Sequence, residues 1–196
     1  SGKAQALLEI RNFTIDFAKI SRHSRNLVYG ADDGLFLWEL WRKSPEGFTA
    51  GICKSVEGKK ILEQYARTLE EIERPVLATN LEEFSDVIFD FVFFRNPVTT
   101  KESFVDFAEK VKNLKELYPE CKIIISQKIP AKAQCLASLI RGIYPQKSSL
   151  IDKIEKLETE FFTSKSEISW NQDDFIASMP KTENTKITCT EKTIIE

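Results

Sequence analysis

The sequence predicts an α/β fold in which a doubly wound, mostly parallel sheet is flanked by helices. Short apolar runs alternate along the chain with stretches of helical periodicity, which is the order that parallel sheets require. The run over residues 87–94 is hydrophobic without interruption, as in strands that are covered on both faces. The chain has 196 residues, 42% of them hydrophobic, and this is enough for one sizeable core. We expect one domain over residues 21–196, preceded by a leading helix within residues 1–20.

The predicted elements follow one another with short connections. In the first half they are a helix over residues 4–20, a strand over 26–29, a helix from Leu35 to Trp41, a strand over 48–53, a helix over 55–69, and strands over 75–79 and 87–94. In the second half they are a helix from a Thr99/Glu102 capping box to Leu117, a strand over 122–126, helices over 131–141 and 149–162, a short helix after Trp170, and β-structure over 186–195.

Charge and cysteine content exclude several classes of function. A net charge of −2 rules out an electrostatic grip on nucleic acid over the whole surface, so any such contact needs a local patch. The four cysteines form no C-x-x-C pair and the chain has one histidine, which argues against a zinc site. Three of them, Cys53, Cys121 and Cys135, lie in apolar runs and are expected to be buried reduced thiols of a cytoplasmic protein. No run approaches the ~20 apolar residues of a membrane span.

The chain opens with Ser1-Gly2, and its only methionine is Met179. Such an opening is typical of a cleavage scar left by protein expression. We therefore expect a domain taken from a longer protein.

The turn after the first predicted strand is the candidate binding loop, because ligands of open α/β sheets bind at the carboxyl ends of the strands. Its glycines, Gly30 and Gly34, suit a close approach by a nucleotide, but the middle position carries Asp32, followed by Asp33. A carboxylate about 4 Å from an anionic ligand repels it by roughly 1 to 4 kcal/mol. The sequence therefore indicates a loop that disfavours an anionic ligand. The alternative is a purely structural turn in which Asp32 or Asp33 caps a helix.

The segment Leu27–Glu39, with Arg22-His23-Ser24 before it and residues 44–47 after it, resembles an S-adenosylmethionine methyltransferase-like domain. That domain is found at the C-terminus of a cyanobacterial fusion protein whose preceding part resembles replication-associated recombination protein A, an AAA+ ATPase. Residues 73–76, 89–96 and 169–175 match as well, so the resemblance spans residues 5 to about 178. It implies a Rossmann-like fold and a role in DNA recombination or replication.

The resemblance also identifies positions at which the chain departs from working methyltransferases. Val28 and Cys53 stand where such enzymes usually have acidic residues, and loss of the ribose-binding carboxylate would cost about 1.5 to 3 kcal/mol of cofactor affinity. Asn96-Pro97 resembles the start of a target-binding segment whose stacking ring is missing here. The implied vestigial cofactor positions are Gly30, Asp32, Gly34, Cys53 and Asn96. We expect no cofactor, no catalytic residue and no metal.

The resulting hypothesis is a non-catalytic accessory domain that binds a protein partner or the ATPase portion of its parent chain. One alternative is an active methyltransferase that uses S-adenosylmethionine. Another is an appendage that contacts DNA through Arg22 and Arg25, although solvated surface charge is the commoner explanation for such residues. The fragment lacks a G-x-x-x-x-G-K-[ST] motif, so it supplies no ATPase site of its own.

Overall fold

The computed structural model describes residues 2–130, 136–143, 146, 148–165, 167–182 and 185–194. The chain divides into two compact units. Unit 1 comprises residues 1–97, 113–126 and 188–196, and unit 2 comprises residues 98–112 and 127–187. Each unit is described separately below.

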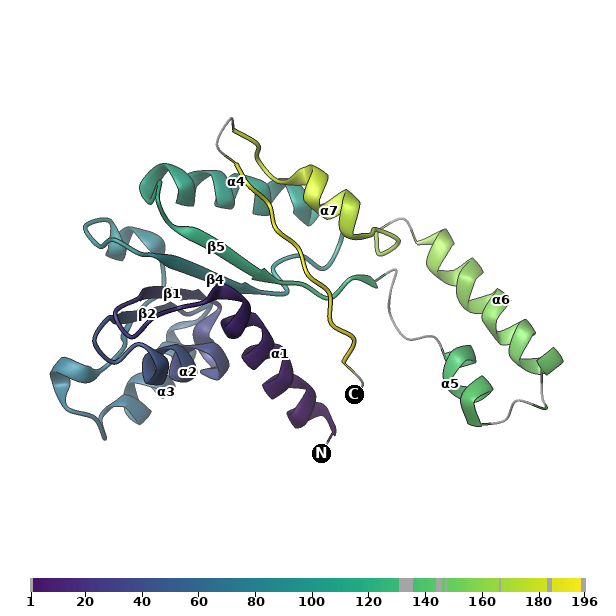
Figure 1. Cartoon of the computed structure of the whole chain (residues 1–196), viewed down its shortest axis with the longest axis horizontal. Helices are drawn as coiled ribbons and strands as arrows, with labels where there is room; N and C mark the ends of the chain where they lie inside the picture. Colours follow the sequence, from purple (N-terminus) through teal and green to yellow (C-terminus); the bar gives the residue numbers. More distant parts are fainter. Residues whose placement is uncertain are drawn as a thin grey trace. The chain divides into compact units, whose positions relative to one another are not determined.

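Unit 1 contains a five-stranded sheet in the order β3-β2-β1-β4-β5 (Figure 1). The strands are β1 (Arg25–Tyr29), β2 (Phe48–Ile52), β3 (Val76–Ala78), β4 (Phe91–Arg95) and β5 (Lys122–Ser126). All four pairings are parallel. The order reverses between β1 and β4, as in doubly wound dinucleotide-binding sheets, so the predicted fold class is confirmed.

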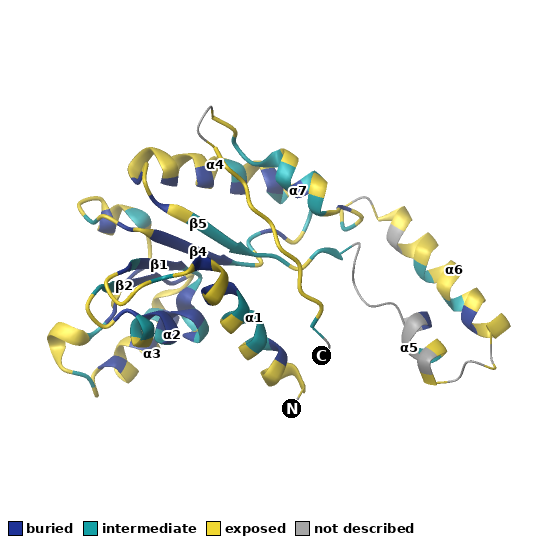
Figure 2. Ribbon diagram, viewed as in Figure 1, coloured by how far each residue is buried: buried dark blue, intermediate teal, exposed yellow. Residues whose placement is uncertain are grey.

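The helices of unit 1 bury the centre of this sheet. They are α1 (Gly2–Ala18), α2 (Leu35–Lys43) and α3 (Val56–Ala66), with short 3₁₀ turns at Ala31–Asp33 (η1), Glu71–Glu73 (η2) and Leu81–Phe84 (η3). One core cluster joins α1, α2, β1 and β4 through side chains such as Ile15, Leu37, Val28 and Phe93. Figure 2 shows β1 and β4 as buried, which is why residues 91–94 of β4 are continuously apolar.

The fourth strand is shorter than predicted, because residues 87–90 lie outside it. Phe89 instead packs edge-on against Phe84 and Tyr118, with ring centroids 5.8 and 5.3 Å away. The Tyr118 hydroxyl donates a hydrogen bond of 2.8 Å to the Phe84 carbonyl oxygen. The apolar character of this run therefore comes from an aromatic cluster before β4 as well as from the strand.

Unit 2 has a core of aromatic rings. Its elements are the first part of α4 (Ser103–Leu117), followed by α5 (Leu136–Ile143), α6 (Ser148–Ser164) and α7 (Gln172–Ser178). The rings of Phe104, Phe107, Trp170 and Phe175 lie with centroids 5.1 to 6.2 Å apart. Asn171 and Asp174 form a reciprocal capping box at the start of α7. The motif over residues 169–175 thus builds the core of unit 2.

Two predictions in the second half are wrong. Because α4 begins at Ser103, Thr99 lies too far upstream to be its N-cap. Residues 186–194 form no strand, since no neighbouring strand pairs with their backbone. In this tail, Lys192 instead lies 3.8 Å from Glu9 and over the Phe13 ring, both on α1. The predicted helix over 131–141 is confirmed from Leu136 onward, and residues 131–135, which include Cys135, lie outside the described residues.

Candidate functional site

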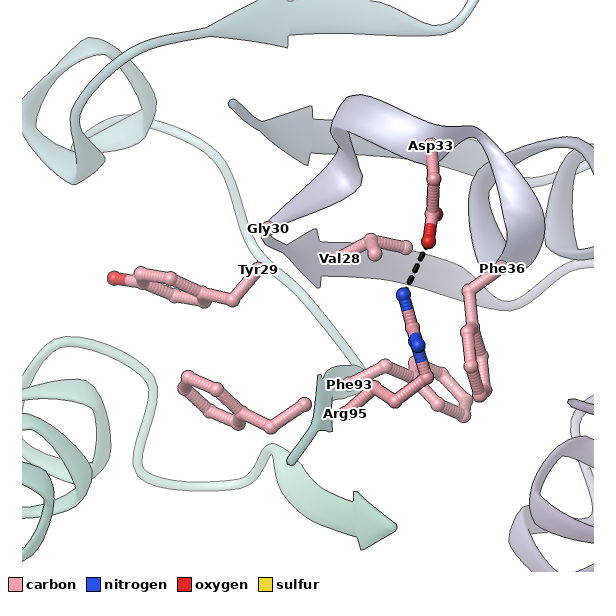
Figure 3. Close-up of a pocket in the computed structure, with 8 residues that line it drawn as sticks. Val28, Tyr29, Gly30, Asp33, Phe36, Phe93 and Arg95 are labelled. Atoms are coloured by element: carbon pink, nitrogen blue, oxygen red, sulfur yellow. Dashed lines mark hydrogen bonds and ion pairs between the residues drawn. The ribbon is translucent and has the colours of Figure 1, made fainter. Parts of the chain in front are cut away.

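The candidate site lies at the carboxyl ends of β1 and β4, where the strand order reverses. Figure 3 shows the residues that line it. Val28, Tyr29 and Gly30 come from the end of β1, Asp33 and Phe36 from η1 and α2, and Phe93 and Arg95 from β4. These residues all belong to unit 1.

The glycine turn has the backbone geometry that its sequence predicts. Gly30 and Gly34 have φ angles of 68° and 67°, in the left-handed region where glycine is favoured. A Cβ atom on Gly30 would lie 3.2 Å from Cε of Lys54, so the Lys54 side chain already covers Gly30. A Cβ on Gly34 would lie 2.7 Å from the indole of Trp38. Gly34 therefore makes room for a side chain of its own helix.

Asp32 connects the glycine turn to the loop before α3. Its carboxylate accepts hydrogen bonds from the N–H of Lys54 at 2.8 Å and from the N–H and hydroxyl of Ser55, each at 3.3 Å. Burial acts to raise the pKa of Asp32, but these hydrogen bonds outweigh it and lower the pKa below its usual value. A Cβ on Gly58 would come within 2.3 Å of Oδ1 of Asp32.

The charged carboxylate of Asp32 thus accepts hydrogen bonds from the chain itself, in the loop just before α3. It does not cap α2, the helix that directly follows the turn. The structural alternative, in which Asp32 caps a helix, is not what is seen: Ser55 is the N-cap of α3, and Asp32 joins two loops.

Asp33 and Arg95 close the crevice between β1 and β4. The Arg95 guanidinium forms an ion pair with Oδ2 of Asp33, drawn as a dashed line in Figure 3. Oδ1 of Asp33 accepts the Leu35 N–H at 3.0 Å, which fixes this carboxylate at the start of α2. The remaining cavity measures about 10 Å³, room for about one water molecule.

Tyr29 points to the other side from the Asp33–Arg95 pair (Figure 3). Its ring stacks on that of Phe94 with centroids 4.7 Å apart and an angle of 17° between the planes. Burial, with smaller contributions from Tyr118 and Glu82, raises the pKa of Tyr29 to about 12. The phenol is therefore neutral at physiological pH and does not act as a base.

Cys53 and Asn96 lie at the same edge of the sheet, each just after a strand. The N–H of Cys53 donates to the Ala78 carbonyl at 2.9 Å, and its side chain is buried. Burial and the nearby charge of Asp32 raise the pKa of the Cys53 thiol to about 11, so the thiol is not an anionic acceptor for a ribose. Asn96 has a φ of 46° and donates its N–H to the Ser126 carbonyl at 2.7 Å. Its backbone thus turns the chain out of β4.

Arg22 and Arg25 lie at the opposite edge of the sheet, where β1 begins. Arg22 pairs with Glu46 at 2.7 Å, and Nε2 of His23 lies 3.2 Å from the same carboxylate. Arg25 donates to the Ile88 carbonyl at 2.7 Å and lies over the Phe48 ring. Both guanidinium groups of the predicted patch are therefore engaged within the chain.

Lys54 and Arg95, which shape the crevice, were not among the predicted site residues. Both are cations directly after apolar runs of the sequence, which is the signal that could have found them. In the part of the chain that the structure describes, no three His, Cys, Asp or Glu side chains are grouped as metal ligands. None of the described helices combines the length and hydrophobicity needed to cross a membrane.

No protein-family profile matches the chain, and no curated protein sequence matches it significantly. Among solved structures, a fibrillarin/Nop5p complex is 13% identical, with a TM-score of 0.45, over 73% of this chain and 68% of the other. Magnesium protoporphyrin IX methyltransferase from Synechocystis PCC 6803 with bound SAM is 13% identical, with a TM-score of 0.43, over 57% and 54%. Plantazolicin methyltransferase BpumL with SAH is 16% identical, with a TM-score of 0.43, over 89% and 60%. The fold assignment rests on the strand order, not on these matches.

Proposed function

We propose that this chain is a methyltransferase-like accessory domain that holds no S-adenosylmethionine and acts by binding a protein partner. The observation that carries this proposal is the closed crevice at the reversal of strand order. There the Asp33–Arg95 pair and the Lys54 side chain occupy the space next to the glycine turn. As the resemblance implies, the partner is the ATPase portion of a replication-associated recombination protein A.

The side chains present do not fit the methyl donor. A ligand of that size needs a pocket of roughly 300 Å³ or more, against a cavity of about 10 Å³ here. The donor carries a carboxylate and a ribose, yet the N-terminus of α3 already binds the carboxylate of Asp32. The position after β2 offers a protonated thiol instead of an acidic acceptor.

Calorimetric titration with S-adenosylmethionine and S-adenosylhomocysteine tests the loss of the cofactor. We expect no saturable heat from the natural sequence. Arg95→Ala, which removes the ion pair across the crevice, is the matched variant. Binding that appears only in this variant would support a crevice closed by its own side chains. A micromolar, one-to-one heat from the natural sequence would overturn the proposal in favour of an active methyltransferase.

An exposed apolar stripe on α6 supports the interaction role. Leu150, Leu157 and Phe161 are exposed, with Ile154 half-buried between them. Their spacing of four, three and four residues is that of a coiled-coil seam. Ile151, which follows Leu150 in the sequence, is fully buried, so α6 is anchored in unit 2 beside the exposed stripe. DNA contact through Arg22 and Arg25 has less support, because both side chains are engaged.

A further inference from the structure

A second pocket of unit 1 lies between α2 and the end of α3, apart from the crevice. It measures about 250 Å³ and is lined by Trp38 and Trp41 of α2 and by Tyr65, Thr68 and Leu69 at the end of α3. An apolar cavity of about 150 Å³ is large enough to bind benzene. The pocket therefore accommodates a small chemical group but not a nucleotide-sized ligand.

Two walls of the pocket are held in place by the fold. The Trp41 indole N–H donates a 2.6 Å hydrogen bond to the Glu73 carbonyl oxygen. The Trp38 indole lies against Gly34, where any Cβ atom would collide with it. The two indole rings stand at 84° with centroids 6.1 Å apart. They form a fixed corner, and the largely exposed Tyr65 ring adds a third aromatic wall.

The pocket presents no cationic side chain to an anion and few hydrogen-bond donors to any ligand. None of its five lining residues is charged. The Thr68 hydroxyl donates to the Tyr65 carbonyl at 3.0 Å, and the Trp41 N–H is already used. The other side-chain donors of the lining are the Trp38 indole N–H and the Tyr65 hydroxyl, and they stand beside aromatic rings whose negative faces attract cations.

The segment at and after the end of α3 has an excess of negative charge. Residues 63–74, which contain three of the lining residues and the following 3₁₀ turn, carry four carboxylates and two guanidinium groups. Nε of Arg74 donates to the Leu69 carbonyl at 3.0 Å, so one of those guanidinium groups is tied to the backbone. The other belongs to Arg67, at the C-cap of α3.

We infer that the Trp38–Trp41–Tyr65 pocket binds an alkylated ammonium group, such as the trimethylammonium of choline or of a trimethylated lysine. Such cations are weakly hydrated, so they gain more from aromatic faces than they lose on leaving water. This site is independent of the proposed loss of the cofactor, because it shares none of the residues that line the crevice.

The decisive experiment compares choline with 3,3-dimethylbutan-1-ol, its uncharged carbon analogue of the same shape. We follow the indole N–H resonances of Trp38 and Trp41 in the intact chain during titration, and we repeat the titration with trimethyl-lysine to distinguish the source of the group. Saturable shifts with choline or trimethyl-lysine, at millimolar concentration or below, and weaker shifts with the neutral analogue would support the proposal. Equal binding of the neutral analogue, or no binding of either cation at about 10 mM, would overturn it.

Two variants at one exposed position test the third wall. Tyr65→Ala removes the ring and is expected to weaken cation binding about threefold or more, whereas Tyr65→Phe keeps the ring and the affinity. Tyr65 is 66% exposed, so both variants should fold. Ile72→Ala, at a side chain 94% exposed and outside the pocket, is the matched control. Unchanged binding by Tyr65→Ala would contradict the assigned role of the ring.

Discussion

Asp32 holds the β2–α3 loop to the glycine turn with a single carboxylate. It accepts hydrogen bonds from two backbone N–H groups and one hydroxyl. A charged acceptor that serves several donors is among the stronger hydrogen-bonding arrangements in proteins. At the scale of the residue, this carboxylate is therefore a structural element of unit 1.

We predict that Asp32→Ala lowers the free energy of unfolding by about 1 to 3 kcal/mol, because it leaves the Lys54 and Ser55 N–H groups without this acceptor. Urea denaturation followed by circular dichroism measures the change. Asp16→Ala is the control. The Asp16 side chain pairs with Lys43 at the surface, and the loss of this pair should lower the free energy of unfolding by less than about 1 kcal/mol. Equal losses in the two variants would show that the bonds of Asp32 contribute nothing specific.

The lowered pKa of Asp32 predicts a pH dependence of stability. A carboxyl group whose pKa is lower in the folded than in the unfolded state stabilises the fold fully above its unfolded value of about 3.9. That contribution is lost as the pH falls through the lower, folded value. The difference in unfolding free energy between the natural chain and Asp32→Asn should thus be largest near pH 7 and shrink below about pH 4. A difference that stays constant from pH 7 to pH 3 would contradict the ionic role of Asp32.

At the scale of the element, the turn between β1 and α2 depends on two glycines with different neighbours. Gly30 faces the end of the flexible Lys54 side chain, whereas Gly34 faces the fixed Trp38 ring. Adding a side chain therefore has different consequences at the two positions, although both have a similar positive φ.

We predict that Gly34→Ala destabilises the fold more than Gly30→Ala does. Both variants place a Cβ at a positive φ, which costs about 1 to 2 kcal/mol. Gly34→Ala also forces Trp38 to move, which adds about 1 kcal/mol or more. Urea midpoints measure both losses, and near-UV circular dichroism should change for Gly34→Ala. Similar midpoints for the two variants would mean that Trp38 relaxes at no cost.

The strands were predictable from short apolar runs, which reflect burial in the central strands β1 and β4, whereas the edge strand β5 is only partly buried. Periodicity alone identified α3 but not its buried face. Of its apolar residues, Val56, Ile61 and Tyr65 are exposed, whereas Leu62 is buried together with Gly58. Which apolar side chains of a helix are buried depends on the elements that pack against it, and periodicity alone does not identify those elements. For the same reason, the alternating tail over residues 186–194 predicted a strand that has no partner.

The position of the candidate site was predictable from the sequence, but the contacts among its residues were only partly predictable. The glycine turn follows from the sequence, because strand, turn and helix succeed one another there. The partners of Asp32 are backbone N–H groups, which carry no residue-specific signal. The pairing of Asp33 with Arg95 depends on β1 and β4 being neighbours, and this requires the strand order.

At the scale of the whole molecule, the chain combines a sheet unit with a second unit built on aromatic rings and helices. The closed crevice lies in unit 1 and the exposed stripe of α6 in unit 2. The proposed interaction role therefore predicts that a change on α6 affects partner binding and leaves the crevice unchanged.

We predict that Leu157→Glu preserves the fold and weakens binding to the ATPase portion about tenfold or more. Leu157 is 65% exposed in the free chain, and burying a leucine at an interface contributes about 1.5 to 3 kcal/mol. Co-purification and surface plasmon resonance with the ATPase portion measure the effect. Lys156→Glu, the neighbouring exposed position outside the stripe, is the control. Loss of binding in both variants to the same extent would point to charge rather than to the apolar stripe.

The distribution of tryptophans provides one optical reporter for each unit. Trp170 is fully buried among the rings of unit 2, whereas Trp38 and Trp41 are only partly buried in unit 1. Indole emission shifts to longer wavelength as its surroundings become more polar, so the two environments should emit at different wavelengths. A Trp170→Phe chain would report on the melting of the sheet unit alone. Its comparison with the natural chain would show whether the two units lose their structure in one cooperative step or in two.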